Sequence, residues 1–262
     1  MRRIAFINHK GGCGKSTTLF HIAGELAIRG NKVLVIDTDK QCDTTNAFLA
    51  EEESNYDFDS NVLTIIDYFE GKPLNECIKK NYIKVGNKKP EYKGIDVIPS
   101  DVRLENQELV LKLMSELKTD IIYEDFESYD FVLFDCPPSN RAVEKLVLGY
   151  LATEIITPMT CDINAIRGYS ELLKLLNDMR VINPALQICG IFLSMFSANR
   201  KKHKQYLDIL RERCGKTFID VQIPLSSDVV VAIEDKGQPM AYYKKTYAKE
   251  KFELLVDEIL LR

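Results

Sequence analysis

The sequence predicts an α/β fold in which a doubly wound, mostly parallel sheet is flanked by helices. Short apolar runs of strand length alternate along the chain with stretches whose apolar residues recur at helical spacing. Several of the runs consist almost entirely of Ile, Val, Leu and Phe, as expected for strands that are buried on both faces of a parallel sheet. Alternation of strands and helices is typical of open, doubly wound sheets.

The order of the elements follows from these runs. Seven segments are predicted to be strands: Arg3–Asn8, Lys32–Asp37, Ile95–Pro99, Phe131–Asp135, Glu154–Pro158, Ile188–Leu193 and Thr217–Ile223. Between them, Thr17–Arg29 and Ala165–Met179 carry an apolar stripe at helical spacing and are predicted to be helices. The least regular region, residues 50–93, looks like an excursion within one domain. We therefore expect a single domain over residues 1–262, with no helix-turn-helix domain before it.

The composition is that of a soluble globular protein, with 45% hydrophobic and 28% charged residues among 262. The net charge of −4 argues against an overall basic DNA-coating protein, although a local basic patch is compatible with it. Seven cysteines show neither C-x-x-C pairs nor zinc-ligand spacing, which indicates free thiols in the reducing cytoplasm. The first apolar run is too short for a signal peptide, and no stretch approaches the ~20 residues that span a bilayer.

A glycine-rich segment, Lys10-Gly11-Gly12-Cys13-Gly14-Lys15-Ser16-Thr17, joins the first predicted strand to the first predicted helix. This setting is that of a P-loop, where glycines let backbone N–H groups approach phosphate oxygens and the helix N-terminus adds partial positive charge. Lys15 is expected to reach the β- and γ-phosphates of ATP, and the Ser16 hydroxyl to ligate Mg²⁺. The standard pattern has glycine where this chain has His9.

Two acidic segments end predicted strands, at the edge where open α/β sheets bind ligands. The run Val33–Ile36 delivers Asp37 and Asp39, and the run Phe131–Phe134 delivers Asp135 in the manner of a Walker B strand. Asp135 is predicted to hold Mg²⁺ through water, because this ion gives up its hydration shell reluctantly. The alternative for each carboxylate is a helix cap or a turn residue.

Together these segments resemble the deviant Walker A class of P-loop ATPases, which includes ParA and MinD. Lys10 is the extra lysine at the start of that signature, and the resemblance runs nearly from end to end. Ile36–Gln41 is similar to the family's D-x-D-P-Q segment, Asp135–Pro138 to its D-x-P-P, and Ile223–Pro239 to blocks typical of ParA proteins. Lys40 stands where ParA proteins usually carry proline, which predicts a looser turn.

The resemblance implies an ATPase that works with MgATP as a nucleotide-sandwich homodimer. Lys10 would reach the partner's ATP and stabilise transition-state charge in trans, in the way of an arginine finger. Asp39 would orient the attacking water, Asp37 would support the outer coordination shell of the metal, and Asp43 would be a switch residue. Contacts to adenine are expected, by analogy with the family, near three residues: Met195, Pro224 and Asp228.

Three outputs are compatible with such an ATPase. DNA partition is the leading hypothesis: the ATP dimer would bind DNA without sequence preference, and hydrolysis stimulated by a ParB-like centromere-binding protein would release it. The second is a MinD-like or other ParA-like spatial regulator that positions a protein assembly or a membrane-associated machine. The third is a nucleotide-dependent interaction protein with negligible turnover.

A basic stretch is the candidate DNA-binding surface, which would make the protein nucleoid-associated. Residues 200–216 contain seven Lys or Arg and two acidic residues, and the candidate contacts are Arg200, Lys201, Lys202 and Lys204. The alternative is a solvated helix face. After Ile223-Pro224, many ParA proteins carry a DNA-contacting arginine, whereas this chain has Ser226-Ser227-Asp228, a departure that weakens the DNA hypothesis.

The charge pattern of the last predicted helix, Tyr247–Arg262, distinguishes a membrane-attached helix from one that packs on the core. Its apolar residues share one face, while the other face carries both signs of charge, unlike the basic face of a MinD-type membrane helix. We therefore expect this helix to pack on the core and expect no stable membrane insertion.

Overall fold

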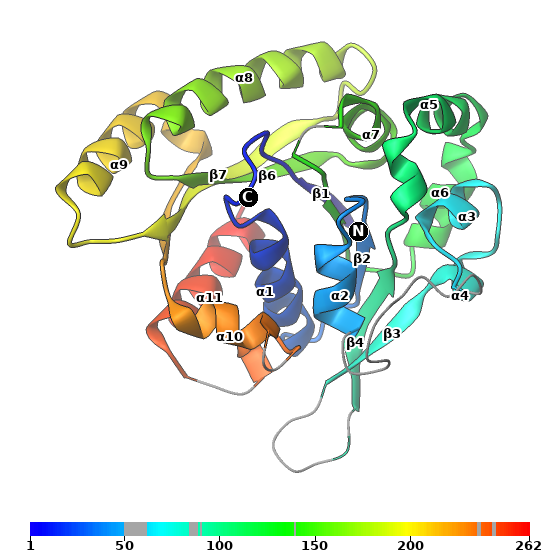
Figure 1. Cartoon of the computed structure of the whole chain (residues 1–262), viewed down its shortest axis with the longest axis horizontal. Coiled ribbons are helices and arrows are strands. Elements are labelled where there is room, and N and C mark those ends of the chain that lie inside the picture. Colours follow the sequence, from blue (N-terminus) through cyan, green and yellow to red (C-terminus); the bar gives the residue numbers. More distant parts are fainter. Residues whose placement is uncertain (50–61, 84–88, 90, 139, 235–236, 243–244) are drawn as a thin grey trace.

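The structure, a computed structural model, describes residues 1–49, 62–83, 89, 91–138, 140–234, 237–242 and 245–262 (Figure 1). Within these ranges eight strands form one sheet in the order β3-β4-β2-β5-β1-β6-β7-β8. Neighbouring strands are parallel except β3 and β4. The strands are β1 (Arg2–Phe6), β2 (Val33–Asp37), β3 (Lys79–Ile83), β4 (Glu91–Ile98), β5 (Phe131–Asp135), β6 (Glu154–Thr160), β7 (Gln187–Phe196) and β8 (Phe218–Pro224). The predicted doubly wound, mostly parallel sheet is confirmed.

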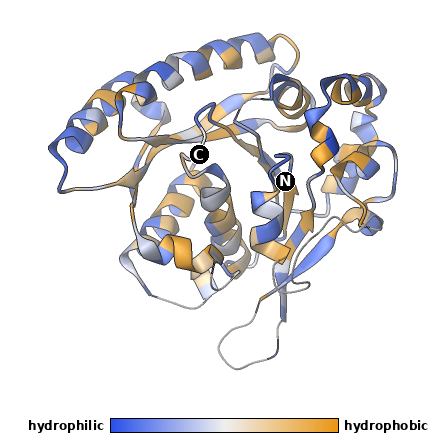
Figure 2. Ribbon diagram, viewed as in Figure 1, coloured by the Kyte–Doolittle hydropathy of each residue, from blue (hydrophilic) through white to orange (hydrophobic). Residues whose placement is uncertain are grey.

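Helices cover both faces of the sheet (Figure 1). One face packs against α1 (Lys15–Ile28), α2 (Asp43–Leu49), α10 (Ser227–Glu234), η4 (Met240–Tyr242) and α11 (Tyr247–Leu260). The other packs against α3 (Ile65–Phe69), α4 (Leu74–Cys77), η1 (Val102–Glu105), α5 (Gln107–Glu116), α6 (Thr119–Phe126), α7 (Arg141–Leu146), the π-helical turn η2 (Val147–Leu151), α8 (Ile163–Arg180) and α9 (Lys201–Cys214). Figure 2 shows α8 and α9 as largely hydrophilic, as expected for helices with one face in water.

The core alternates between the two faces of each inner strand. In β1, Ile4 and Phe6 belong to the core under α1, whereas Ala5 belongs to the core on the opposite face. β2 divides in the same way, with Val35 on one side and Leu34 on the other. Because helices cover both faces, the buried positions 4–6 in β1 and 33–36 in β2 are all apolar, which is why the sequence located these strands.

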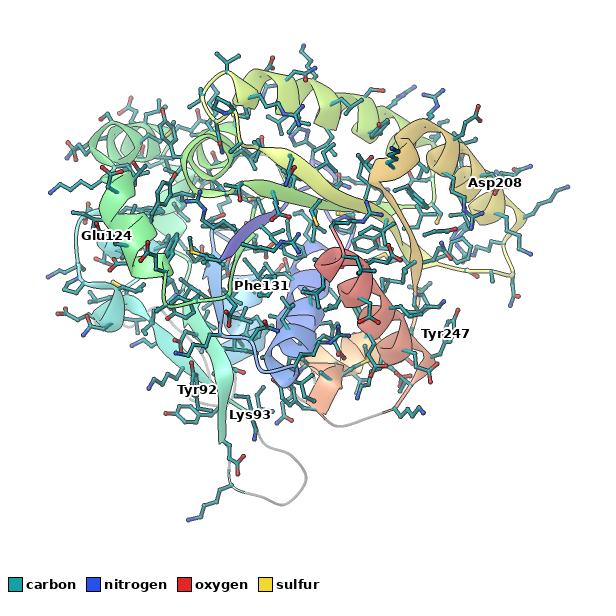
Figure 3. All side chains as sticks on the ribbon, turned by 180° about the vertical axis from the view of Figure 1, so that it is seen from behind. Tyr92, Lys93, Glu124, Phe131, Asp208 and Tyr247 are labelled. Carbon is teal, nitrogen blue, oxygen red and sulfur yellow. The ribbon has the colours of Figure 1, made fainter. Side chains whose placement is uncertain are left out.

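The region expected to be irregular contains regular structure. α3, α4 and the edge strand β3 form within residues 62–83, and β3 pairs antiparallel with β4. β4 begins at Glu91 rather than Ile95, and Figure 3 labels Tyr92 and Lys93 on the part of it that the sequence did not predict. An edge strand is partly exposed and carries polar side chains, so β3 lacks an apolar signature. The acidic run Glu51–Glu53 lies outside the described residues.

The terminal helix α11 packs on the core, as predicted. Its apolar side chains Phe252, Leu255, Val256 and Ile259 are buried in the core beside α1. Arg29, directly after α1, donates a hydrogen bond to Asp257 Oδ1 at 2.6 Å and ties the two helices together at the surface. In the part of the chain that the structure describes, no helix is long and apolar enough to cross a membrane.

One acidic side chain lies between these helices. Glu25 of α1 is only 3% exposed, and burial, with the nearby charge of Glu253, raises its pKa from 4.5 to about 7. A carboxyl whose pKa is higher in the folded state holds its proton more tightly there. The folded chain therefore loses stability as the pH rises from about 4.5 towards 7, and the loss is complete above pH 7.

We expect Glu25→Gln to raise the free energy of unfolding at pH 8 by up to about 3 kcal/mol and to change it little at pH 4. The amide keeps the shape of the side chain but carries no charge to desolvate. Urea unfolding at both pH values measures the difference. Glu124→Gln on the exposed side of α6 is the control (Figure 3). An equal stability change at both pH values for Glu25→Gln would contradict the assignment.

Candidate nucleotide site

The P-loop connects β1 to α1 at the carboxyl end of the central strands. Gly12 and Gly14 have φ angles of 68° and 87°, in the left-handed region that favours glycine. A Cβ added at Gly11 or Gly12 would meet no atom within 4 Å among the described residues, so open space lies over the loop. α1 begins at Lys15 without a side-chain cap at its N-terminus. Its first-turn N–H groups and partial positive charge therefore suit an anion.

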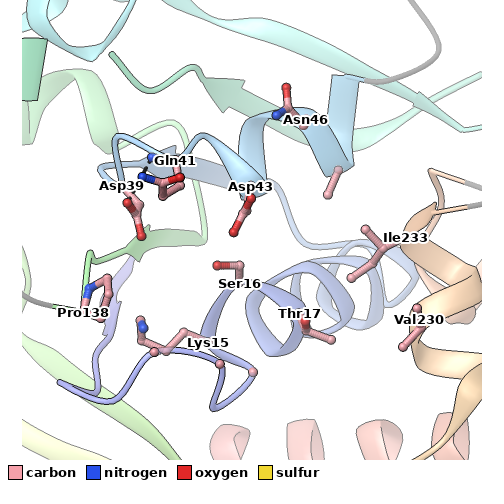
Figure 4. Close-up of a pocket in the computed structure, with 14 residues that line it drawn as sticks. Lys15, Ser16, Thr17, Asp39, Gln41, Asp43, Asn46, Pro138, Val230 and Ile233 are labelled. Carbon is pink, nitrogen blue, oxygen red and sulfur yellow. Dashed lines mark hydrogen bonds between the residues drawn. The ribbon is translucent and has the colours of Figure 1, made fainter. Parts of the chain in front are cut away.

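A pocket of about 640 Å³ opens over the P-loop, within the range of small-molecule sites (Figure 4). The P-loop forms its floor, the segment after β2 forms one wall, and α10 forms another. The lining residues are Gly11, Gly12, Gly14, Lys15, Ser16, Thr17, Asp39, Gln41, Asp43, Asn46, Ala47, Pro138, Val230 and Ile233. Figure 4 shows Asp39, Asp43 and Ser16 directed into a common space above Lys15. The predicted P-loop residues other than Lys10 and Cys13 are thus brought together with Asp39.

Asp37 and Asp135 end the neighbouring strands β2 and β5 and lie opposite each other in register. Burial raises the pKa of both carboxyls, and the charge of Asp135 adds to the effect on Asp37. The Thr44 hydroxyl donates to Asp135 Oδ2 at 2.6 Å, whereas the buried Oδ1 of Asp135 has no hydrogen-bond partner among the described residues. A buried carboxylate that has one unpartnered oxygen and interacts with the Ser16 hydroxyl fits a hard cation such as Mg²⁺.

The carboxylate of Asp37 is occupied by hydrogen bonds. It accepts from Asp39 N at 3.0 Å, from Thr45 N at 2.8 Å and from Thr45 Oγ1 at 2.7 Å. These bonds anchor the turn after β2 and the first turn of α2. Its assignment to the outer coordination shell of a metal stays a prediction.

The turn after β2 places Asp39 at the pocket. Asp39 Oδ1 accepts a hydrogen bond from Gln41 N at 3.1 Å, and Cys42 N donates to Asp39 O at 2.8 Å. Lys40 forms an ion pair with Glu105 of η1, which links the turn to its neighbour. The looser turn that the missing proline suggested stays a prediction.

Lys10 is directed away from the pocket of its own chain. Its Nζ donates to Thr160 Oγ1 at 2.9 Å and forms an ion pair with Asp162, which caps the N-terminus of α8. The described residues that line the nucleotide pocket include Lys15 but not Lys10. Lys15 thus faces the pocket, whereas Lys10 contacts the segment between β6 and α8.

Cys13 is the one P-loop residue between Gly12 and Gly14, and it is fully buried. Burial raises the pKa of its thiol, although the charges of Lys15 and Lys10 oppose the shift. A protonated, enclosed thiol is a small apolar filler and not a nucleophile. The Ser194 hydroxyl donates to Cys13 O at 2.6 Å and supports the loop from β7.

The family model described as AAA domain matches residues 1–188. The chain belongs to this AAA domain family. Two relatives align along its full length. The "Chromosome partitioning protein ParA" of Caulobacter vibrioides is 27% identical over 273 residues, covering 100% of this chain and 95% of that protein. The "Chromosome-partitioning ATPase Soj" of Treponema pallidum is 29% identical over 269 residues, covering 100% and 98%.

A solved structure has the same fold as this AAA domain chain. It is a putative plasmid partition protein from Borrelia burgdorferi B31 bound to AMPPNP, with a TM-score of 0.75 and 23% identity, covering 99% of this chain and 98% of that chain. Together with the relatives named ParA and Soj, it confirms the ParA-like resemblance that the sequence motifs predicted.

The predicted adenine contacts of the AAA domain chain stay predictions. Met195 Cε lies 3.9 Å from the place that a Cβ on the last P-loop glycine would take. Pro224 ends β8 and Asp228 lies in the first turn of α10, and the pocket-lining residues of the described chain include neither of them nor Met195. α10 instead presents Val230 and Ile233, which the sequence reasoning missed. Exposed apolar residues on a short helix give no signal that separates a ligand wall from ordinary surface.

The predicted DNA contacts of the AAA domain chain gather at one helix end. Arg200 is the N-cap of α9, and Arg200, Lys201, Lys202 and Lys204 are all exposed. Arg211 on the same helix instead forms ion pairs with Asp220 at 2.8 Å and with Asp208 at 3.1 Å. Positive side chains at a helix N-terminus repel the helix dipole, and a bound anion would relieve that repulsion.

Proposed function

We propose that this chain is a MgATP-dependent partition ATPase whose ATP-bound form is a homodimer. The observation that carries the proposal is the opposed placement of Lys15 and Lys10. Lys15 binds the β- and γ-phosphates in its own pocket. Lys10, once it leaves Thr160 and Asp162, reaches the nucleotide of a second copy and stabilises the charge that develops during hydrolysis.

The acidic residues divide the remaining work. Ser16 would hold Mg²⁺ directly, Asp135 would hold it through water, and Asp37 would support the outer shell. When bound, the ion would supply charge that neutralises the phosphates. Asp39 orients the attacking water, since its side chain reaches the pocket while its backbone is fixed by hydrogen bonds.

The basic N-terminal end of α9 is the DNA-binding surface of the proposed ATPase. In the ATP dimer it binds DNA phosphates without sequence preference, which makes the protein cytoplasmic and nucleoid-associated. A ParB-like partner accelerates hydrolysis and so releases the dimer from DNA. The relatives named as partition proteins support this output over other uses of the same ATPase.

The test uses random-sequence duplex DNA and light scattering. With MgATP the parent chain is expected to have twice the monomer mass and to retain DNA at low salt, with an affinity that falls steeply as salt rises. The triple variant Arg200→Glu, Lys201→Glu and Lys202→Glu is expected to lose DNA binding by at least about 100-fold while it still dimerises, because repulsion replaces three phosphate contacts.

The control changes the same charge elsewhere. Lys112, Lys118 and Lys174 are exposed on or beside other helices, and their simultaneous replacement by Glu should reduce DNA affinity far less. No DNA retention by the parent at low salt with ATP would favour the protein-positioning alternative. A parent that stays monomeric with ATP would contradict the dimer itself.

A further inference from the structure

A buried serine contacts the turn that carries Asp39. Ser100 follows β4 and is fully buried. Its hydroxyl donates to the backbone carbonyl oxygen of Asp39 at 2.7 Å, and its N–H donates to Thr45 Oγ1 at 3.0 Å. Ser100 is thus bonded both to the turn after β2 and to α2. It is not among the described residues that line the nucleotide pocket.

These bonds close a ring. Thr45 Oγ1, which accepts from Ser100 N, donates to Asp37 Oδ2 at 2.7 Å, and Asp37 Oδ1 accepts from Asp39 N at 3.0 Å. The Ser100 hydroxyl then returns to Asp39 O. Asp37, Thr45 and Ser100 are at most 4% exposed, so water competes little for these bonds.

The ring encloses a strained backbone. Cys42 lies between Asp39 and α2 and has a φ of 58°, a left-handed conformation that disfavours a residue with a side chain. Such a residue persists only where the surrounding structure holds it. The ring supplies that hold, because it fixes the chain on both sides of Cys42.

Ser100 differs from the other members of the ring in its origin. Asp37 and Asp39 belong to the strand and turn that need positioning, and Thr45 belongs to the helix that follows them. Ser100 comes from the end of β4, which pairs with β2 through the register Ile36↔Ile98. Ser100 therefore links the turn after β2 to the end of the neighbouring strand β4.

We propose that Ser100 is a positioning residue for Asp39. Its hydroxyl fixes the backbone of the turn so that the Asp39 carboxylate stays at the pocket in the orientation that hydrolysis requires. The inference rests on the proposed ATPase function and adds to it a residue that touches neither nucleotide nor metal. Loss of the hydroxyl leaves the Asp39 carbonyl oxygen buried without this donor and frees the turn to shift.

The expected result is a separation of turnover from binding. Ser100→Ala should lower kcat at saturating MgATP by about 10-fold, since a small displacement of a catalytic group is costly, and should leave the Kd of AMPPNP within about 3-fold. Thr45→Val, which keeps the shape but breaks the ring, should do the same. Thr45→Ser keeps the hydroxyl and should retain most of the parental kcat.

A matched control removes a comparable bond at the surface. Ser115→Ala deletes an exposed hydroxyl that donates to Lys112 O at 2.7 Å in α5, and it should leave both constants unchanged. Unfolding of each variant shows whether it is folded at the assay temperature.

Either of two results for Ser100→Ala would overturn the inference: a kcat within twofold of the parent, or a Kd that rises as much as kcat falls. Equal losses in Thr45→Val and Thr45→Ser would also overturn it, because the hydroxyl would then not matter. A parent chain that does not hydrolyse ATP at all would instead refute the proposed function. If Asp39→Ala slows hydrolysis and Ser100→Ala does not, only the inference about Ser100 fails.

Discussion

Lys15→Ala is expected to weaken MgATP binding by at least about 100-fold. Lys15 is only 7% exposed, lies on the floor of the pocket and supplies a cation inside it. Without this charge, the loop's N–H groups alone must compensate the β- and γ-phosphates in a partly desolvated site. Titration with a fluorescent ATP analogue measures the loss.

Thermal unfolding provides an independent reading of the same change. A ligand that binds only the folded state stabilises it in proportion to RT ln(1 + [L]/Kd), so MgATP should raise the Tm of the parent and not that of Lys15→Ala. Lys112→Ala on α5 is the control for loss of a surface charge. If Lys15→Ala bound MgATP within about 5-fold of the parent, the pocket would not be the phosphate site.

Asp39→Ala is expected to keep ATP binding and ATP-dependent dimers while turnover falls by at least about 100-fold. Asp39 lines the pocket through its side chain, and its removal takes away the group assigned to orient water but no phosphate ligand. Phosphate release at saturating MgATP, together with light scattering in ATP and in ADP, separates the two effects.

Asp120→Ala on the exposed first turn of α6 is the control for removal of one carboxylate. Hydrolysis by Asp39→Ala at the parental rate would show that another group orients the water. Asp43, directed into the same pocket, would then be the next candidate.

The sequence predicted those parts of the site that depend on residues close together along the chain. Gly12 and Gly14 adopt the left-handed angles that the glycine pattern implied, and Lys15 follows them at the start of α1. Asp37 and Asp135 end inner strands whose apolar residues pack on both faces. Motif spacing and strand burial together therefore located the loop beneath the pocket and the acidic residues beside it.

Contacts between distant segments could not be predicted in the same way. Ser100 meets Asp39 because β4 lies beside β2, a neighbour relation that no spacing along the chain reveals. The wall formed by Val230 depends on how α10 packs into the core on the face of the sheet that α1 also covers. β3 was missed because a partly exposed edge strand needs few apolar residues.

The irregular pairing at the two margins of the sheet has a consequence for self-association. The pairing of β3 with β4 is interrupted between Lys80 and Tyr82, and that of β7 with β8 shifts register twice. A strand from another molecule can pair with an edge strand only where that edge presents an even row of free N–H and C=O groups. The irregular pairing and the exposed ammonium group of Lys80 disfavour such strand addition. Two copies of this chain therefore have little to gain by extending the sheet sideways. The proposed dimer would instead meet through the carboxyl ends of the strands, where the pocket lies, and there its association can depend on a ligand.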